Sequence, residues 1–100
     1  MMNKKIRSDA VDQLFDAVLS LENREECYAF FEDICTVNEI HAIAQRLQVA
    51  KLLSEKRTYT EIEAVTKAST ATISRINKCL VYGADGYKRV LERLQEKRDE

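Results

Sequence analysis

Two helix-start signals lie close together between residues 57 and 80, and they constrain the fold of this chain more than any other feature. Thr58 is followed three residues later by Glu61, the spacing of a capping box, in which a Thr hydroxyl and a Glu carboxylate satisfy each other's free backbone N–H groups. Ser69 has the short hydroxyl side chain that caps the first turn of a second helix well. Only a tight turn separates the two predicted helices. This arrangement is typical of a helix-turn-helix unit, which places its second helix in the major groove of DNA.

The two predicted helices each have an apolar side. At about 100° per residue, Ile73, Ile76 and Leu80 fall on one side of the second helix. Ile62 and Val65 form the matching stripe of the first helix. We therefore expect the two helices to pack through these residues.

The opposite side of the second helix is small, polar or cationic, and it carries Thr70, Ala71, Ser74, Arg75 and Lys78. Small hydroxyl side chains let the backbone come close to base edges, and Arg and Lys reach guanine or phosphate. The alternative is that this side is merely exposed to water. Exposed helices usually mix Glu with Lys, but no Glu occurs from residue 64 to residue 80. This absence favours DNA binding.

The predicted DNA-binding residues come from both helices and are Tyr59, Thr60, Lys67, Ser69, Thr70, Ala71, Thr72, Ser74, Arg75 and Lys78. We assign positions 70, 71 and 74 to base edges, and Arg75 and Lys78 to phosphate or guanine. Tyr59 and Thr60 would bind phosphate, aided by the positive N-terminal end of the first helix. General attraction is expected from the cations Lys56, Arg57 and Lys67.

The rest of the chain predicts an all-α single domain of 100 residues with six helices. The absence of proline and the presence of only two glycines favour long helices. We predict a flexible arm over residues 1–7, dimerisation helices over 8–56, the helix-turn-helix over 57–82 and a last helix over 84–96. The other predicted helix starts are Ser8, Asn23, Thr36 and Asp85, with a left-handed C-terminal cap at Gly83 and frayed residues from Glu96 on.

The predicted second helix indicates a partner subunit. Its residues Tyr28, Phe30, Phe31 and Ile34 occupy more than one side. Such a helix is buried on two sides, in a core or against another subunit. For so short a chain we favour another subunit.

Charge is distributed unevenly along the chain. Residues 1–40 hold four basic and nine acidic side chains, a net charge of −5, whereas residues 51–80 hold six basic and three acidic ones, a net charge of +3. The second segment gives a local basic surface for DNA on a chain whose overall charge is −1. No apolar run is long enough to span a bilayer, and no signal peptide is recognisable, so we expect a cytoplasmic protein without a membrane partner.

Enzyme chemistry is not expected. The cysteines are three in number, Cys27, Cys35 and Cys79, and none has CxxC spacing. An odd number without that spacing indicates buried free thiols rather than a metal site or disulfide. His41 has no cysteine or histidine within helical reach that could bind a metal with it. Neither a metal, a cofactor nor a set of catalytic residues is therefore predicted.

The chain resembles the Trp repressor superfamily, close to the branch labelled YerC/YecD. The resemblance runs from about Phe31 to Leu94 and is most specific over residues 69–75, Ser-Thr-Ala-Thr-Ile-Ser-Arg. Upstream, Gln-Arg-Leu at 45–47 and Ala-Lys-Leu-Leu at 50–53 support it, as does Tyr59 followed by Glu-Ile. It implies a six-helix fold in which two chains intertwine through their N-terminal helices and bind double-stranded DNA.

The resemblance also implies an effector pocket, whose residues here would be Thr36, Arg46, Arg75 and Cys79. In the Trp repressor a glycine of the second helix leaves room for the indole ring of tryptophan. Ile76 stands at that position here, and its side chain would fill the space. Tryptophan is therefore not expected as corepressor, and the effector, if there is one, is unknown.

Two positions of the helix-turn-helix depart from the usual pattern. The turn position often held by glycine is Lys67, which must then adopt a left-handed conformation. Glu63 stands where a small residue is usual, so either its side chain swings outward or the two helices pack at a slightly different angle.

Overall, the sequence predicts a sequence-specific transcription regulator, more specifically a repressor that binds pseudo-palindromic operators as a dimer. The alternative is a helical protein-interaction module without DNA-binding activity, in which the aromatic N-terminal half is the partner surface.

Overall fold

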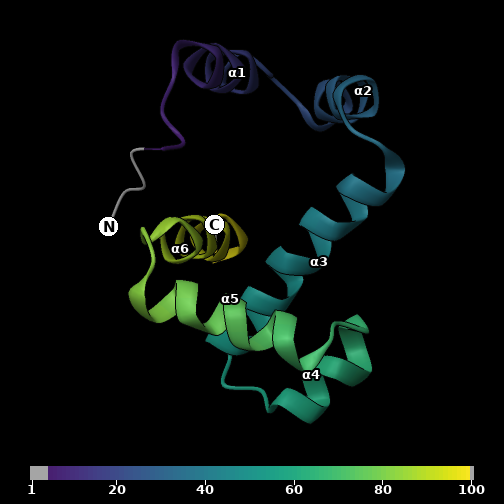
Figure 1. Cartoon of the computed structure of the whole chain (residues 1–100), viewed down its shortest axis with the longest axis vertical. Helices are drawn as coiled ribbons and strands as arrows, with labels where there is room; N and C mark the ends of the chain where they lie inside the picture. Colours follow the sequence, from purple (N-terminus) through teal and green to yellow (C-terminus); the bar gives the residue numbers. More distant parts are fainter. Residues whose placement is uncertain (1–4, 100) are drawn as a thin grey trace. The chain divides into compact units, whose positions relative to one another are not determined.

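The computed structural model describes residues 5–99 and is all-α, as predicted (Figure 1). Its six helices are α1 (Asp9–Leu19), α2 (Arg24–Ile34), α3 (Val37–Ser54), α4 (Tyr59–Thr66), α5 (Thr70–Tyr82) and α6 (Gly86–Asp99). No strand occurs among residues 5–99. Residues 1–4 of the predicted arm lie outside the described part.

The chain divides into two compact units, one up to His41 and one from Ala42 onwards. Each unit is described separately, and the single domain stays a prediction. Within residues 5–99, no helix is both long enough and apolar enough to cross a membrane.

The first five helices begin after their predicted caps. The side chains of Ser8 and Asn23 accept hydrogen bonds from the third backbone N–H beyond them, at 3.1 and 2.9 Å. Thr36 makes a complete capping box with Glu39: the Glu39 N–H donates to the Thr36 hydroxyl (3.1 Å), and the Thr36 N–H donates to the Glu39 carboxylate (2.8 Å). Hydrogen bonding of the Glu39 carboxylate to the Thr36 backbone, and after it to the Thr36 side chain, lowers the pKa of Glu39.

The core of the second unit lies beneath the helix-turn-helix. It consists of Val49 and Ala50 of α3, Ile62 of α4, Ala68 of the turn, and Ile73 and Ile76 of α5. α4 packs against α5, and α5 packs against α6. Tyr87 and Leu91 of α6 cover the core from one side. The core therefore fixes α4 and α5 relative to each other.

One predicted core residue is wrong. Ile62 is fully buried, but Val65 is 52% exposed. Thr66, four residues after Ile62, takes the inward position instead. Its hydroxyl can be buried because it donates to the Ile62 carbonyl (2.8 Å).

The predictions for the end of α5 and for α6 need three corrections. Gly83 has φ −84° and ψ −159°, so it is extended and not left-handed. The left-handed residue is Asp85, with φ 66°. Asp85 does precede α6 and accepts the Arg89 N–H through its carbonyl (3.0 Å), but its carboxylate lies 4.0 Å from the Lys88 ammonium. α6 also continues to Asp99 instead of ending near Glu96.

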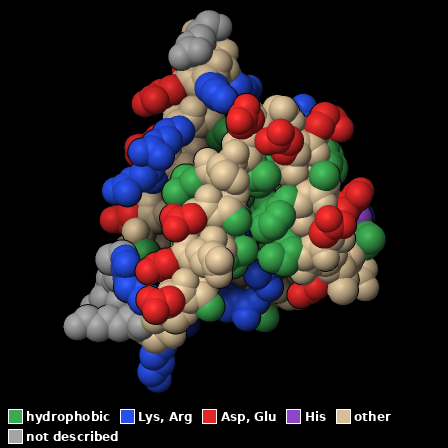
Figure 2. Space-filling view, turned by 90° about the horizontal axis from the view of Figure 1, so that it is seen from above, with side chains coloured by type: hydrophobic (Ala, Val, Ile, Leu, Met, Phe, Trp, Pro, Cys, Tyr) green, Lys and Arg blue, Asp and Glu red, His purple; other side chains and the backbone are tan. Residues whose placement is uncertain are grey.

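The first unit leaves large hydrophobic side chains at its surface. Phe15 and Leu19 of α1 are 52% and 81% exposed, and Tyr28 and Ile34 of α2 are 61% and 52% exposed. Phe30 and Phe31 contact each other edge to face at 5.6 Å. Figure 2 shows hydrophobic side chains at the surface between acidic ones. The two-sided burial predicted for α2 is therefore absent within the single chain.

The cysteines are free thiols, but the prediction that they are buried is wrong. Cys27 and Cys79 are exposed and Cys35 is half-buried. Within residues 5–99, no three His, Cys, Asp or Glu side chains are placed to hold a metal ion.

Candidate nucleic-acid interface

The turn between α4 and α5 is held by side-chain hydrogen bonds to its backbone. Lys67 is left-handed, with φ 64° and ψ 13°, as predicted. The Ala68 N–H donates to the Thr66 hydroxyl (3.1 Å), and the side-chain amide of Gln45 on α3 donates to the Thr66 carbonyl (3.0 Å). The Gln45 bond ties the turn to α3, and the Ala68 bond stabilises the turn itself.

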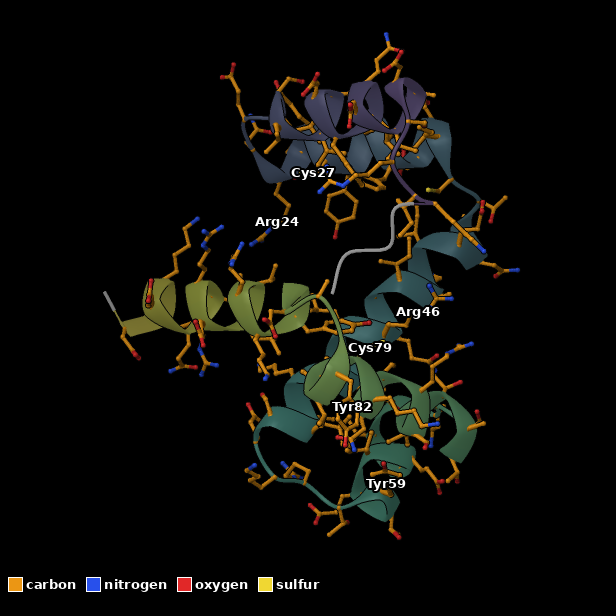
Figure 3. All side chains as sticks on the ribbon, turned by 60° about the vertical axis from the view of Figure 1, so that its left-hand side comes forward. Arg24, Cys27, Arg46, Tyr59, Cys79 and Tyr82 are labelled. Atoms are coloured by element: carbon orange, nitrogen blue, oxygen red, sulfur yellow. The ribbon has the colours of Figure 1, made fainter. Side chains whose placement is uncertain are left out.

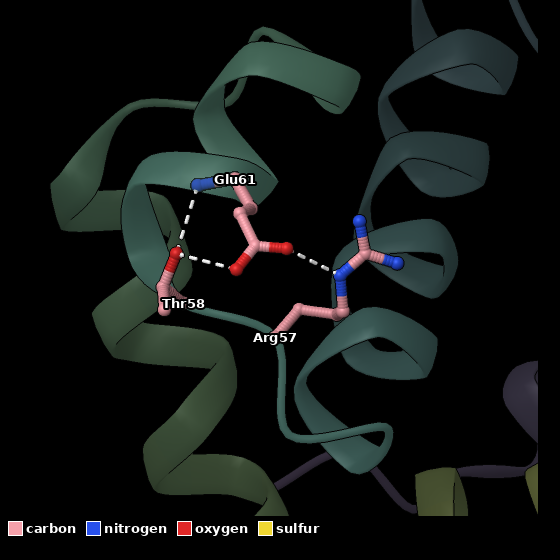
Figure 4. Close-up of polar contacts among 3 residues, drawn as sticks. All are labelled: Arg57, Thr58 and Glu61. Carbon is pink, nitrogen blue, oxygen red and sulfur yellow. Dashed lines mark hydrogen bonds and ion pairs between the residues drawn. The ribbon is translucent and has the colours of Figure 1, made fainter.

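α4 begins with a capping arrangement that includes an ion pair (Figure 4). The Glu61 N–H donates to the Thr58 hydroxyl (3.1 Å), which itself donates to one Glu61 carboxylate oxygen (3.1 Å). The other oxygen accepts from Nε of Arg57 at 2.6 Å. The hydrogen bond from Arg57, followed by that from Thr58, lowers the pKa of Glu61. Arg57 is thus partly neutralised, which weakens its expected attraction for DNA.

α5 presents the predicted DNA-binding residues on its outer side. Thr70, Ala71, Arg75 and Lys78 are exposed, and Thr72 and Ser74 are half-buried. Tyr59, Thr60, Lys67 and Ser69 are exposed on α4 and in the turn. We call Thr70, Ala71, Ser74, Arg75 and Lys78 the reading surface. None of its side chains belongs to the buried core.

Two of the predicted residues are already used in capping. The Ser69 hydroxyl accepts the Thr72 N–H (3.2 Å) and donates to the Thr72 hydroxyl (3.0 Å). These bonds satisfy a backbone donor in the first turn of α5. Ser69 and Thr72 therefore shape the N-terminus of α5.

An acidic side chain, which the sequence pattern did not place here, contacts the reading surface. The Thr70 hydroxyl donates to the Glu63 carboxylate, which joins α4 to the first residue of α5. Glu63 is half-buried and is not part of the core. Its carboxylate contacts the reading surface. The sequence pattern did not show this contact, because residues 63 and 70 come together only once the turn has formed.

The cations of the reading surface have no acidic partner at ion-pair distance in the part of the chain from residue 5 to residue 99. Arg75, Lys78 and the turn residue Lys67 are all exposed. Their charges are therefore available for phosphate groups.

Three residues of the predicted effector pocket, Arg46, Arg75 and Cys79, interact electrostatically with Tyr87. Arg46 of α3 and Cys79 of α5 are labelled in Figure 3. Burial raises the pKa of the Tyr87 phenol, charge interaction with Cys79 raises it further, and the positive charges of Arg46 and Arg75 oppose this rise. Tyr87 is not among the predicted residues of the pocket. Thr36, the fourth predicted residue, caps α3 in the other unit.

The position expected to admit an indole is filled. Ile76 is 3% exposed and belongs to the core, as its place in the apolar stripe predicted. The large groove of the second unit, about 660 Å³, lies elsewhere and is lined by residues of α3, α5 and α6 that include Leu80 and Leu91. Arg46, Arg75 and Cys79 are not part of its lining.

Comparison with known proteins decides the family. A family model described as Trp repressor protein matches residues 9–95. The chain belongs to the Trp repressor family. It is 54% identical over 96 residues to the uncharacterised protein YerC of Bacillus subtilis (strain 168). The matched region covers 96% of this chain and 92% of YerC.

Solved structures of Trp repressor-like proteins share the fold. A candidate Trp repressor from Staphylococcus aureus matches with a TM-score of 0.90 and 55% identity, over 95% of each chain. A TrpR-like protein from Eubacterium eligens ATCC 27750 matches with a TM-score of 0.90 and 58% identity, over 93% of this chain and 96% of that one. The predicted superfamily, YerC-like branch and all-helical fold are thereby confirmed.

Proposed function

We propose that this protein is a sequence-specific DNA-binding transcription regulator, a cytoplasmic repressor without enzymatic activity. The observation that carries the proposal is the geometry of α4, the turn and α5. Ile62 of α4 and Ile73 and Ile76 of α5 are buried in one core, whereas Thr70, Arg75 and Lys78 remain exposed on the outer side of α5. Membership of the Trp repressor family supports the same function.

The proposed mechanism requires a homodimer. Two copies of α5 would enter successive major grooves on one face of the duplex, about 34 Å apart, at a pseudo-palindromic operator. The exposed hydrophobic side chains of α1 and α2 support such a partner. Hydroxyl side chains such as Thr70 and Ser74 suit water-mediated base contacts, which the Trp repressor itself illustrates.

Substitution of Lys78 tests the proposed phosphate contacts. Lys78→Ala should weaken binding to all duplexes about equally and lower the salt slope, per subunit, by about one. The measurement is the affinity for an operator and an unrelated duplex across a range of salt concentrations. A loss confined to the operator would contradict the assignment.

The main rival is a protein-interaction module that binds no DNA. A mobility-shift assay with a nonspecific duplex distinguishes the two functions. A DNA-binding protein shifts the duplex at low salt and releases it as the salt concentration rises, whereas a protein-interaction module shifts it at neither low nor high salt.

We further propose that tryptophan is not the corepressor, because the Ile76 side chain fills the core at the critical position. A thermal-shift titration with tryptophan should show no saturable stabilisation. Saturable stabilisation would overturn this part of the proposal alone.

A further inference from the structure

Glu63 is an acidic side chain beside an otherwise cationic reading surface. It is half-buried on α4, four residues after Tyr59 and three after Thr60, so it lies on the same side of the helix as these two. Its carboxylate accepts the hydroxyl hydrogen of Thr70. In helix-turn-helix proteins the N-terminal residues of the second helix contact base edges. Glu63 is thus held at the end of α5 where bases are read.

A carboxylate in this position is not suited to bind the DNA backbone, because phosphate is also an anion. An ionised carboxylate accepts hydrogen bonds and donates none. Thr70 has one hydroxyl hydrogen, and it is given to Glu63, so only the lone pairs of that hydroxyl remain for another partner. The Glu63–Thr70 pair therefore offers acceptors and no donor to an approaching duplex.

This pattern matches one base better than the others. In the major groove guanine and thymine present only acceptors among their polar groups, whereas cytosine and adenine each present an amino donor. The adenine N6 amino group lies next to the acceptor N7 of the same base, which would face the carboxylate oxygens, whereas the neighbour of the N4 amino group on the cytosine ring is the non-polar C5–H. Glu and Asp accordingly pair with cytosine, and Gln and Asn with adenine.

We propose that Glu63, oriented by Thr70, selects a cytosine in each half-site of the operator. This inference rests on the proposed function, since it requires that α5 enters the major groove. It assigns specificity to a residue of α4, outside the second helix that the sequence pattern identified as the reader.

The test is selection of bound sites from random duplex DNA with the full-length protein. The wild type should enrich cytosine at one position of each half-site. Glu63→Gln should replace that cytosine by adenine, because glutamine pairs with adenine N6 and N7, with a change in preference of about tenfold or more. Thr70→Val, which leaves the carboxylate without its hydroxyl partner, should weaken the cytosine preference without introducing adenine.

Glu92→Gln on α6 is the matched control, because it removes the same charge from an exposed side chain outside the helix-turn-helix. It should leave every position of the motif unchanged. Circular dichroism establishes that each variant is folded before selection.

The outcomes separate the inference from the function on which it rests. If the wild type enriches a motif and folded Glu63→Gln enriches the same one, even with tighter binding, this inference is overturned and the regulator remains. If the folded wild type enriches no motif, both are overturned.

Discussion

Lys67 has a backbone conformation that disfavours any residue with a Cβ atom. Its φ of 64° and ψ of 13° lie in the left-handed region, where a non-glycine residue is destabilised by roughly 1–2 kcal/mol. The tight turn nevertheless forms, because Thr66 and Gln45 bond to its backbone and Ala68 is buried. The strain at Lys67 is thus balanced by its neighbours.

Lys67→Gly should therefore stabilise the protein. Relief of the left-handed conformation exceeds the conformational entropy that glycine loses on folding, so we expect a gain of about 0.5–1 kcal/mol in the free energy of unfolding. Lys78→Gly, the same change inside α5, should instead lower it by about 1 kcal/mol. Urea denaturation of both variants measures the difference, and destabilisation by both would show that Lys67 is not strained.

At the scale of single residues, the sequence predicted those positions that local rules decide. The left-handed Lys67 and the core position of Ile76 follow from the turn spacing and the apolar stripe. Val65 was misplaced, because a stripe counted by hydrophobicity does not recognise that Thr66 can be buried by bonding to its own helix. The Glu63–Thr70 contact was missed because it depends on how two helices cross.

At the scale of the helices, the starts were predictable because each cap is a contact within four residues. Ser8, Asn23, Thr36, Thr58 and Ser69 all accept a backbone N–H three residues ahead. The end of α5 was predicted at the right residue for the wrong reason. Glycine is needed at 83 because a side chain would not fit there, and this constraint is visible only in three dimensions.

The two glycines should respond oppositely to alanine. At Gly83, an added Cβ would collide with the backbone carbonyl of Cys79, which also accepts the Gly83 N–H at 2.9 Å. Gly83→Ala should therefore lower the free energy of unfolding by about 1–3 kcal/mol. Gly86→Ala meets nothing within 4 Å in the first turn of α6 and should be neutral or stabilising by up to about 1 kcal/mol. Equal effects in thermal denaturation would contradict the steric argument.

The start of α4 should be sensitive to acid. Its Arg57 and Thr58 bonds hold the pKa of Glu61 below the ordinary 4.5, so the folded state binds the proton less readily than the unfolded state. The resulting stability is present above pH 4.5 and disappears as the pH falls through the folded-state pKa. Glu61→Gln, which cannot titrate, should be less stable than the wild type at pH 7, and this deficit should shrink as the pH falls to 3.

Urea midpoints at the two pH values measure this difference. Arg57→Gln removes the largest cause of the lowered pKa, so its deficit relative to the wild type should also shrink in acid. A Glu61→Gln deficit of the same size at pH 7 and pH 3 would exclude the proposed linkage.

At the scale of the whole molecule, the sequence identified surfaces but not what covers them. The second helix was expected to be buried on two sides, yet Tyr28 and Ile34 of α2 are more than half exposed in the single chain. Burial against another chain leaves the same pattern in a sequence as burial in a core, because both require apolar side chains at helical spacing. Periodicity alone therefore cannot distinguish a core from a subunit interface.

The proposed homodimer makes the role of Leu19 testable. This side chain is 81% exposed, so Leu19→Glu should leave the fold of the single chain intact but place a charge in an apolar interface. We expect the dimer dissociation constant to rise at least about tenfold in sedimentation equilibrium, and the melting temperature to lose its increase with protein concentration. Val65→Glu, at a residue 52% exposed on α4, is the control and should leave dimerisation unchanged. A monomeric wild type, or equal weakening by both substitutions, would rule out an interface formed through α1.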